Sequence, residues 1–469
     1  MRSLPDTTFA VVAITSGGEP RIARYRRPEN LKTFEILNIA DPKILATRPT
    51  RSKLLDADAL ASCTAELLVG GRAAQLAEVL RHLKAIGPHA TLSDLLNSRA
   101  AWTIVRRMYE VLVPKSSFLQ FFWTWRCLVG GLYAVALAHL PNARCYHAIS
   151  TGYAGLLAAR AAIETGRPSL VTEHGIYTNE RRIELMMARW IVDTVDKGFC
   201  ITDNRLDIRE IWIEAFNAYA RCAYDACDHI ITLFGDNQAM QRDLGAVPGK
   251  QIMIPNGIEL APFADIAKHY PNTRPTIALI GRVVPIKDVK TFIAAVEQAR
   301  RRIPSLRALV LGGTDEDPDY FVECQEMVAD FGLSDVIEFT GNVRILAYLS
   351  QIDVIVLTSL SEAQPLVILE AGAAGIPCVT TNVGCCKELL EGRASEVPHL
   401  GRGGYVTDIA APDQLAQAIG TLLESADERE LMGKNLRERV TRHYTSASAS
   451  QAYRDLYRLL IAQPSRIAA

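Results

Sequence analysis

From residue 274 onward, short runs of aliphatic and β-branched residues alternate with stretches whose apolar residues recur every three or four positions. The short runs predict strands and the periodic stretches predict helices. Because strands that alternate with helices form parallel sheets with right-handed crossovers, we expect a doubly wound sheet here. The predicted strands are 276–280, 307–311, 336–339, 354–357 and 378–381, and the predicted helices are 289–302, 320–331, 345–350, 366–374, 387–391, 414–424 and 429–443.

The first half of the chain follows a less regular pattern, with long helical stretches between short strands. A segment with three prolines, 261–275, reads as a linker, so we expect an acceptor-side domain at 1–260 and a second domain at 274–445. The final helical pattern, 447–462, predicts that residues 446–469 cross back to the first domain. The predicted strands are 9–15, 34–40, 145–149, 170–172, 229–233 and 252–254, and the helical patterns are 57–86, 92–113, 119–140, 153–165, 181–195 and 205–227.

Composition narrows the class of protein. A length of 469 residues favours two domains, and 49% hydrophobic with 22% charged residues is a globular composition. A net charge of −1 gives no basic excess, so we expect no nucleic-acid partner. The ten cysteines show no metal-ligand spacing, and we expect free thiols and no bound metal.

The apolar segments predict a soluble protein. The N-terminus lacks a signal-peptide pattern, and Arg126 interrupts the most membrane-like stretch, 118–140. What remains of that stretch is too short to span a bilayer. We therefore expect a cytoplasmic protein, with peripheral association at the inner membrane as an alternative.

The strongest candidate for chemistry is the segment Ser361-Glu362-Ala-Gln-Pro365-Leu-Val-Ile-Leu-Glu370-Ala-Gly372. It places Glu362 in the loop before a helix and Glu370 inside that helix. The free N–H groups and positive dipole end of a helix N-terminus bind anions. Glu370 is placed to accept hydrogen bonds from vicinal hydroxyls such as those of ribose. Two ordinary surface glutamates are the alternative, but the apolar run between them favours function.

A second candidate is Gly281-Arg282-Val-Val-Pro285-Ile-Lys287, between the first strand and the first helix of the second domain. The guanidinium of Arg282 can bind a phosphate through two N–H groups, and Lys287 supplies a point charge. Alone the pattern is weak, because surface loops commonly carry arginine and lysine. Together with the first candidate, in the same sheet, it predicts a diphosphate site.

The third candidate is Thr172-Glu173-His174-Gly175, at the end of a strand in the first domain. A lone histidine is more often structural than catalytic. Here it lies in a loop where ligands of parallel sheets bind, beside a glycine that permits a tight turn. We therefore favour a functional role for His174.

Together these segments resemble the GT4 family of retaining glycosyltransferases, and within it the enzymes of Pel exopolysaccharide synthesis. The resemblance covers most of the chain from about residue 140 onward. It rests on the motifs Thr172-Glu-His-Gly-Ile-Tyr177, Glu180-Arg-Arg-Ile-Glu184, Ile254-Pro-Asn-Gly-Ile258 and the run from Leu357 to Pro377.

The resemblance implies a GT-B fold, in which two Rossmann-like doubly wound domains face a central cleft. It implies a UDP-sugar donor, a polysaccharide acceptor, no cofactor or metal, and partners in an inner-membrane synthase and export complex. The diphosphate would be held by Arg282, Lys287, Gln364, Pro365 and Leu366. Retention in this family is usually explained by attack on the same face as the leaving phosphate, so phosphate stabilisation is the main electrostatic contribution.

The resemblance also assigns the remaining site residues. Glu370 would bind the ribose, while Glu362 would contact the hydroxyls of the transferred sugar. His174 would hydrogen-bond that sugar from the acceptor-side domain, and we take His174 and Glu362 as the catalytic pair. The base would lie against the loop residues Asn342, Val343 and Arg344.

The N-terminus departs from the family pattern. Members normally open with a strand, a glycine-rich loop and a helix, whereas 9–15 corresponds to the family's second strand and Gly17-Gly18 reads as a turn. We therefore expect the first strand, loop and helix of the acceptor-side domain to be absent.

Two other functions stay open: a subunit or scaffold of a synthase complex that binds nucleotide sugar without turnover, and a GT-B phosphorylase. The phosphorylase would need a pyridoxal phosphate lysine, which no motif identifies.

Overall fold

The computed structural model describes residues 1–17, 26–40, 56–87, 90–188, 190–191, 206–264, 266 and 274–463. The chain forms two compact units, one of Met1–Met253 with Tyr453–Ala469 and the other of Ile254–Ala452. The units therefore divide between Met253 and Ile254, before the boundary placed at residue 260 from the sequence. Residues 265 and 267–273 of the expected linker lie outside the described residues.

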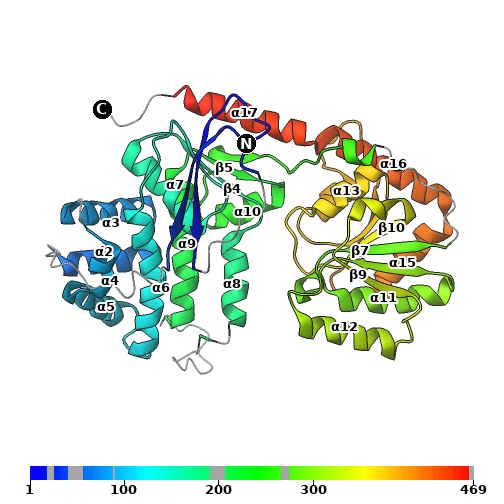
Figure 1. The fold of residues 1–469 in the computed structure, drawn as a ribbon, viewed down its shortest axis with the longest axis horizontal. Coiled ribbons are helices and arrows are strands. Elements are labelled where there is room, and N and C mark those ends of the chain that lie inside the picture. The colour runs from blue at the N-terminus through cyan, green and yellow to red at the C-terminus, as the bar shows by residue number, and fades with distance from the viewer. Residues whose placement is uncertain are drawn as a thin grey trace. The chain divides into compact units, whose positions relative to one another are not determined.

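The second unit is built on one sheet of six parallel strands, in the order β12-β11-β10-β7-β8-β9 (Figure 1). Helices cover both faces, with α11 and α12 on one and α13 on the other. The strands are β7 (Thr276–Ile280), β8 (Arg307–Leu311), β9 (Ile337–Gly341), β10 (Val354–Leu357), β11 (Cys378–Thr381) and β12 (Gly404–Thr407). The helices are α11 (Val289–Arg302), α12 (Pro318–Asp330), α13 (Leu366–Ala374), α14 (Cys386–Glu391), α15 (Pro412–Glu424) and α16 (Ala426–His443).

The helices on both faces explain why the strands of this sheet are almost continuously apolar. All four residues of β10 and of β11 are buried, and Phe292 of α11 packs into the same core at 0% exposure.

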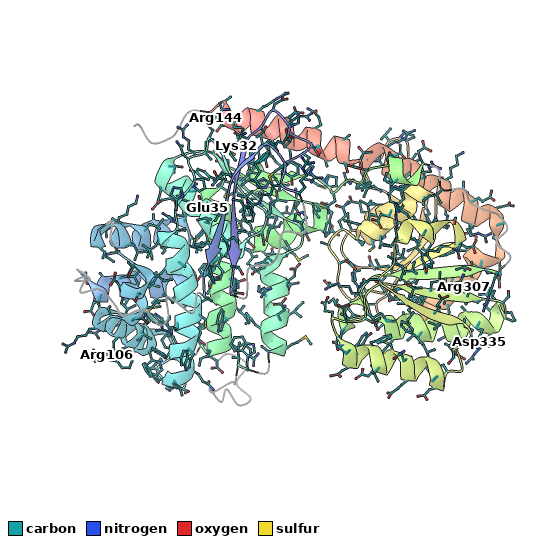
Figure 2. All side chains as sticks on the ribbon, in the orientation of Figure 1. Lys32, Glu35, Arg106, Arg144, Arg307 and Asp335 are labelled. Atoms are coloured by element: carbon teal, nitrogen blue, oxygen red, sulfur yellow. The ribbon has the colours of Figure 1, made fainter. Side chains whose placement is uncertain are left out.

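The charged end of the sheet lies where the strands begin. Arg307, at the start of β8, pairs with Glu338 at 2.7 Å, and Figure 2 shows it on the same unit as Asp335.

The first unit contains two smaller sheets. Four parallel strands form the order β3-β4-β5-β6, and β1 and β2 pair in parallel as a separate two-stranded sheet. The strands are β1 (Phe9–Thr15), β2 (Leu31–Asn38), β3 (Tyr146–Ala148), β4 (Ser169–Glu173), β5 (His229–Thr232) and β6 (Gln251–Met253). The helices beside the four-stranded sheet are α7 (Gly152–Thr165), α8 (Tyr177–Met187), α9 (Ile208–Ala226) and α10 (Gly235–Asp243).

A layer of helices stands between β2 and β3 in the chain and forms the outer part of the first unit (Figure 1). Its core includes Trp125 and Tyr133, both at most 1% exposed, and the Tyr133 hydroxyl lies 3.1 Å from the Thr64 hydroxyl. The helices of this layer are α2 (Ala57–Leu68), α3 (Ala73–Ile86), α4 (Leu92–Asn97), α5 (Arg99–Leu112) and α6 (Phe118–Leu137). None of the helices in the described parts of the chain is both long and apolar enough to cross a membrane.

The last helix, α17 (Ser446–Ile461), begins in the second unit and ends in the first. Its later residues belong to the first unit because Tyr457 hydrogen-bonds to His147 of β3 at 2.6 Å. Residues 464–469, the end of the segment expected to cross back, lie outside the described residues.

Several helices differ from the sequence predictions. The predicted helix 57–86 is two helices, because Gly70 takes a φ of +85° and the backbone turns there. The predicted helix 92–113 is also divided, because the Ser98 side chain caps α5 by accepting from the Ala101 N–H. The helix predicted at 181–195 spans 177–187, and its predicted end lies outside the described residues.

Two elements were not predicted from the sequence. The first is β12. The pair Gly403-Gly404 is typical of a turn, yet the backbone of β12 pairs with β11 from Gly404, opposite Cys378, onward. A Cβ at Gly404 would lie 1.9 Å from the Cys378 carbonyl oxygen, so the absence of a side chain permits the pairing. The other element, α10, is mostly polar and shows little apolar periodicity.

Candidate functional site

The candidate residues of the second unit gather where β7 and β10 end. These strands are neighbours, but the chain leaves β7 toward β8 and leaves β10 toward β11, so the connections run in opposite directions. In a doubly wound sheet the crevice at such a switch point is where ligands bind. The loop after β7 carries Arg282 and Lys287, and the loop after β10 carries Glu362.

Lys287 and Glu362 form the central contact of this edge. The Lys287 ammonium donates to Glu362 Oε1 at 2.5 Å, and the two side chains are 23% and 14% exposed. The Ser359 hydroxyl donates to the same carboxylate oxygen at 2.7 Å. The backbone of Lys287 is held as well, because the Thr358 hydroxyl donates to its carbonyl at 2.8 Å. The site thus has a fixed, partly buried ion pair.

The loop that carries Glu362 rests on the segment after β11. Gly384, at a φ of +52°, lies so close that a Cβ there would be 2.3 Å from the carbonyl oxygens of Glu362 and Ala363. The N–H of Cys385 donates to the Ala363 carbonyl at 2.9 Å. Only glycine fits this contact, because it accepts a left-handed conformation and needs no space for a side chain.

Helix α13 begins directly after this loop with unsatisfied amide groups. Pro365 precedes the helix without a side-chain cap, and the N–H groups of Leu366 and Val367 have no acceptor among the described residues. Such a helix end attracts anions. Gln364 is 6% exposed, and its side-chain oxygen accepts from the Asn256 N–H at 2.7 Å. Its amide oxygen therefore holds the loop from residue 254 against the start of α13.

Glu370 lies one turn further along α13. Its side chain is half-buried, and burial raises the pKa of its carboxyl group. No hydrogen bond to its carboxylate is present within the described ranges. Because buried carboxylates are normally paired, Glu370 is available to a ligand that donates hydrogen bonds.

Arg282 has a partner that the sequence analysis did not predict. Its guanidinium donates to both carboxylate oxygens of Glu316 at 2.5 Å, with side chains 57% and 53% exposed. Lys287 and Glu362 are therefore brought together, whereas Arg282 is tied to the loop after β8. The same loops also join through the backbone, where the Val283 N–H donates to the Gly313 carbonyl at 2.9 Å.

The loop after β9 joins this cluster from the other side. The Gly312 N–H donates to the Gly341 carbonyl at 3.1 Å, and a Cβ at Gly313 would lie 3.1 Å from the Asn342 side chain. Asn342 and Arg344 are exposed, and Val343 is partly buried. The predicted base-binding residues therefore lie at the same edge of the sheet as Arg282.

In the first unit, His174 follows β4 and its side chain is exposed. The preceding residue, Glu173, is 1% exposed and accepts hydrogen bonds from Thr151 at 2.9 Å, Tyr224 at 2.5 Å and Gln241 at 3.0 Å. Burial raises the pKa of Glu173 despite these donors. The network fixes the backbone from which His174 projects.

A second histidine lies close to the first. His147, on β3, contacts the Thr172 hydroxyl through Nε2 at 2.8 Å and the Tyr457 hydroxyl through Nδ1 at 2.6 Å. Burial, together with the charge of His174, lowers the pKa of His147 to about 4. His147 is therefore a neutral structural group that supports β4.

Sequence reasoning missed Ser359, Glu316 and Glu173. Ser359 and Glu173 each lie at the end of a parallel strand, and this position was an available signal. Glu316 gave no local signal, because its role depends on a loop 34 positions away in the chain. The described residues contain no group of metal-ligating side chains, and the nine described cysteines are all free.

Two family models match the chain. Residues 1–249 match the model described as "Domain of unknown function (DUF3492)". Residues 274–425 match the model described as "Glycosyl transferases group 1". The second match covers the sheet that carries Lys287, Glu362 and Glu370.

Among curated proteins, the chain is similar to the GDP-mannose-dependent alpha-(1-6)-phosphatidylinositol monomannoside mannosyltransferase of Mycobacterium tuberculosis. The two are 30% identical over 189 residues, which is 38% of this chain and 46% of that protein. The chain spans about half the length of the curated relatives it matches.

Solved structures show the same fold. Sucrose-phosphate synthase from Thermosynechococcus elongatus aligns with a TM-score of 0.55 and 22% identity, covering 72% of this chain and 79% of that one. Anabaena HepE in complex with UDP-glucose aligns with a TM-score of 0.52 and 18% identity, covering 78% and 90%. The predicted GT-B class, with two Rossmann-like α/β domains, is confirmed.

Proposed function

We propose that this chain, which belongs to the family described as "Domain of unknown function (DUF3492)" and carries a "Glycosyl transferases group 1" domain, is a retaining glycosyltransferase that uses a nucleotide diphosphate sugar. The observation that carries the proposal is the Lys287–Glu362 ion pair at the switch point of the sheet, beside the uncapped start of α13. A cation next to free helix amides suits a diphosphate, and the adjoining carboxylate suits a sugar hydroxyl.

Donor binding would rearrange this ion pair. Without a ligand, the charge of Lys287 is balanced by Glu362. A diphosphate brings a larger negative charge to the same place, so Lys287 would turn to the phosphate and release the Glu362 carboxylate. The free carboxylate can then accept hydrogen bonds from the transferred sugar. The pair thus keeps both groups in position before the donor arrives.

The rest of the donor would extend along the same edge. The N–H groups of Leu366 and Val367 would bind phosphate oxygens, and Glu370 would accept hydrogen bonds from the ribose hydroxyls. Gln364 and Pro365 would shape the start of the helix. The base would lie against the loop of Asn342, Val343 and Arg344, and Arg282 would reach the diphosphate after leaving Glu316.

Charge stabilisation would supply the main catalytic effect. As the bond to the sugar breaks, negative charge grows on the leaving phosphate. The ammonium of Lys287 and the N–H groups at the start of α13 would stabilise this charge. Attack by the acceptor on the same face would let this phosphate take the proton of the nucleophile, with retention. His174 of the first unit would hydrogen-bond the transferred sugar. No metal or cofactor is required in this scheme.

The donor and acceptor are the finer parts of the proposal. We take the donor as a UDP-sugar and the acceptor as a growing exopolysaccharide, because the motifs around Glu173 and Glu362 resemble PelF of Pel exopolysaccharide synthesis. HepE was solved with UDP-glucose, whereas the mycobacterial relative is named as GDP-mannose-dependent. Partners in an inner-membrane synthase complex and a cytoplasmic location follow from the same resemblance.

The test combines binding with turnover. Calorimetry with UDP and GDP, followed by release of nucleotide from UDP-sugars and GDP-mannose with an acceptor glycan, separates the two donor classes. We expect Lys287→Ala and Glu370→Ala to lower turnover, the first by about 10²–10³-fold, which is the usual effect of removing one group that stabilises transition-state charge.

The matched control is Lys290→Ala, which removes an exposed lysine of α11 that pairs with Glu323. This variant should keep wild-type turnover. Unchanged rates in both site variants would sink the proposed donor site. Tight nucleotide binding without turnover, even with membrane partners present, would instead identify a binding subunit of a synthase complex.

A further inference from the structure

The hairpin of α5 and α6 in the first unit carries an unusual aromatic face. We define this aromatic face as Trp102, Phe118, Leu119, Phe122 and Trp123. Its rings touch in sequence: Trp102 and Phe118 lie 5.5 Å apart, Phe118 and Phe122 6.5 Å, and Phe122 and Trp123 5.4 Å between centroids. On α6, Leu119, Phe122 and Trp123 follow the spacing i, i+3, i+4, and Phe118 lies four positions before Phe122, so these residues share one side of the helix.

Much of this face is open to solvent. Trp102 is 53% exposed, Trp123 56% and Leu119 65%. A single exposed apolar residue is ordinary, but a contiguous group that includes two tryptophans marks an interaction surface. An exposed apolar group of this kind is typical of a surface that binds a partner.

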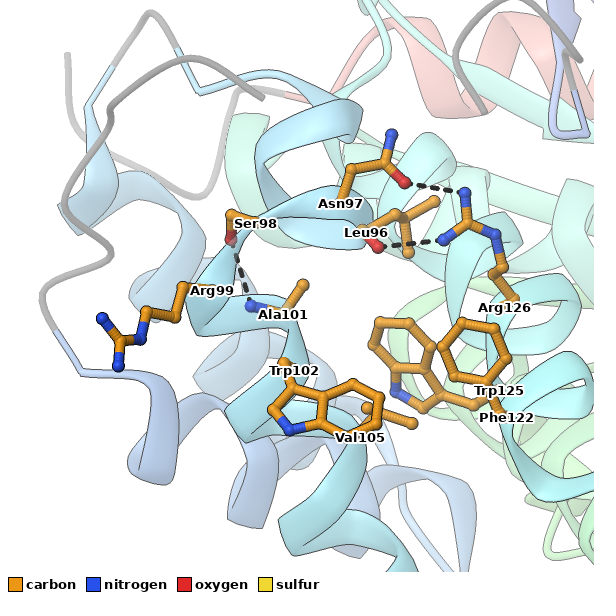
Figure 3. A pocket seen from close by; sticks show the side chains of 10 residues that line it. All are labelled: Leu96, Asn97, Ser98, Arg99, Ala101, Trp102, Val105, Phe122, Trp125 and Arg126. Carbon is orange, nitrogen blue, oxygen red and sulfur yellow. Dashed lines mark hydrogen bonds between the residues drawn. The ribbon is translucent and has the colours of Figure 1, made fainter. Parts of the chain in front are cut away.

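A cavity of about 450 Å³ opens beside the face (Figure 3). Its apolar walls include Trp125, Val105 and Phe122. Most of the polar side chains around it are already engaged, because Arg126 donates to the Leu96 carbonyl and to Asn97, and Ser98 caps α5. The guanidinium of Arg99 has no partner among the described residues. Few polar groups are left to hydrogen-bond the hydroxyls of a sugar, so the cavity favours an apolar occupant.

The charges around the face are positive. Residues 98–127 contain five basic side chains and one acidic one, in a chain whose net charge is −1. None of the ten residues that line the cavity is acidic, and Arg99 and Arg126 both belong to that lining. Figure 2 labels a further arginine of α5, Arg106, which pairs with Glu110 at 3.7 Å. Lys115 is exposed in the loop between the helices and has no such partner among the described residues.

We propose that the aromatic face docks the protein on an anionic lipid bilayer, with an acyl chain entering the neighbouring cavity. Tryptophan rings settle at the boundary between headgroups and acyl chains, and flanking arginines and lysines bind anionic headgroups. The bilayer fits better than a neutral saccharide because the face combines apolar area with positive charge. The proposal does not depend on the donor chemistry of the second unit.

Vesicle sedimentation of the full chain tests this docking. We expect binding to vesicles of phosphatidylcholine with 30% phosphatidylglycerol and much less to phosphatidylcholine alone. Trp123→Glu should abolish binding, and Arg99→Gln should reduce it about fivefold on the anionic vesicles only. Three of the five tryptophans, residues 102, 123 and 125, lie in the hairpin, so brominated lipids should quench the fluorescence on binding.

The matched control is Leu431→Glu, which places the same charge at a leucine that is 58% exposed on α16 of the second unit. This variant should sediment like the wild type. All variants should bind UDP equally, so a failure of docking is distinguishable from a failure of the donor site. Equal sedimentation of wild type and Trp123→Glu, or a wild type that binds neither vesicle, overturns the proposal and points to a protein or saccharide occupant.

Discussion

The carboxyl ends of the two main sheets differ in how their acidic residues are paired. In the second unit the edge carries an ion pair, Lys287–Glu362, with partly exposed side chains. In the first unit the corresponding edge carries Glu173, which is buried and bound only by neutral donors. Both edges belong to parallel sheets, so the topology alone does not explain the difference.

The difference shows what each edge can do. A partly exposed ion pair can exchange its internal partner for a charged ligand at little cost, because solvent already screens it. A buried carboxyl in a neutral network cannot be moved without breaking several hydrogen bonds at once. The Lys287–Glu362 pair can therefore exchange partners for a charged ligand, whereas the network around Glu173 holds the backbone of His174 in place.

The interior of the second unit contains a more deeply buried ion pair. Breaking this pair should cause the largest loss of stability among the proposed variants. Arg439 binds Glu396 through two hydrogen bonds of 2.7 and 2.9 Å, and the side chains are 1% and 3% exposed. Arg439→Met leaves a buried carboxylate without its partner, so the free energy of unfolding should fall by about 3–5 kcal/mol. Thermal unfolding followed by circular dichroism measures the loss.

Arg442→Met is the control for this variant, because the exposed Arg442–Glu438 pair lies on the same helix, α16. Its effect should stay within about 0.5 kcal/mol. Equal losses in the two variants would remove the distinction between buried and exposed ion pairs.

The first unit should instead lose stability at acid pH. Burial lowers the pKa of His147 to about 4 in the folded protein, from a usual value of about 6.5. Between these values the unfolded chain binds more protons, so stability is lost as the pH falls from 6.5 to 4, by up to about 3 kcal/mol. All five tryptophans lie in the first unit, so urea unfolding followed by their fluorescence reports this unit alone.

His147→Gln should flatten this pH dependence, whereas His139→Gln, at a side chain that is 72% exposed, should follow the wild-type profile. A His147→Gln profile as steep as that of the wild type would assign the acid sensitivity to another group.

The loop that carries Glu362 should be sensitive to a single methyl group at Gly384. Gly384→Ala would place a Cβ 2.3 Å from two carbonyl oxygens of the Glu362 loop, in addition to the strain of a φ of +52°. The left-handed conformation alone costs about 1–2 kcal/mol, and displacement of the loop should weaken UDP binding about tenfold. Calorimetry measures the binding.

Gly332→Ala is matched to this variant, because Gly332 has a φ of +62° with nothing within 4 Å of the added Cβ. It should lose stability but keep UDP affinity. Equal UDP affinity in the two variants would show that the Glu362 loop does not shape the donor site.

The smallest expected effect concerns the exposed pair of Arg282 and Glu316. Glu316→Gln should change stability by less than about 0.5 kcal/mol. It should strengthen UDP binding about twofold to fivefold, because the diphosphate no longer competes with Glu316 for the guanidinium. Glu323→Gln, which frees Lys290 of α11, serves as control and should leave UDP affinity unchanged.

Unchanged or weaker UDP binding by Glu316→Gln would exclude Arg282 from the donor site. Lys287 and the α13 amides would then be the remaining phosphate ligands, and the electrostatic contrast between the two edges would rest on one cation.

Prediction from sequence succeeded where local pattern and tertiary structure agree. The bounds of β7, α11, β8, β10, α13 and β11 were predicted as the structure has them. Local signals are clear there: β7 is an apolar run between Pro275 and Gly281, and α13 lies between Pro365 and Gly375. The helical layer was predicted less well. Its breaks at Gly70 and Ser98 interrupt continuous apolar periodicity, and the packing of neighbouring helices decides where such breaks occur.

The sequence by itself determined the parallel sheet of the second unit and the placement of Lys287, Glu362 and Glu370 near its carboxyl edge, since alternating strands and helices make the sheet parallel and put these residues after its strands. The tertiary structure alone decided which charges meet. Lys287 lies 75 positions from Glu362 in the chain and Arg282 lies 34 from Glu316, and pairings over such separations depend on how loops pack against each other. The exposed aromatic face likewise became visible only after folding, because burial and exposure are properties of the assembled surface.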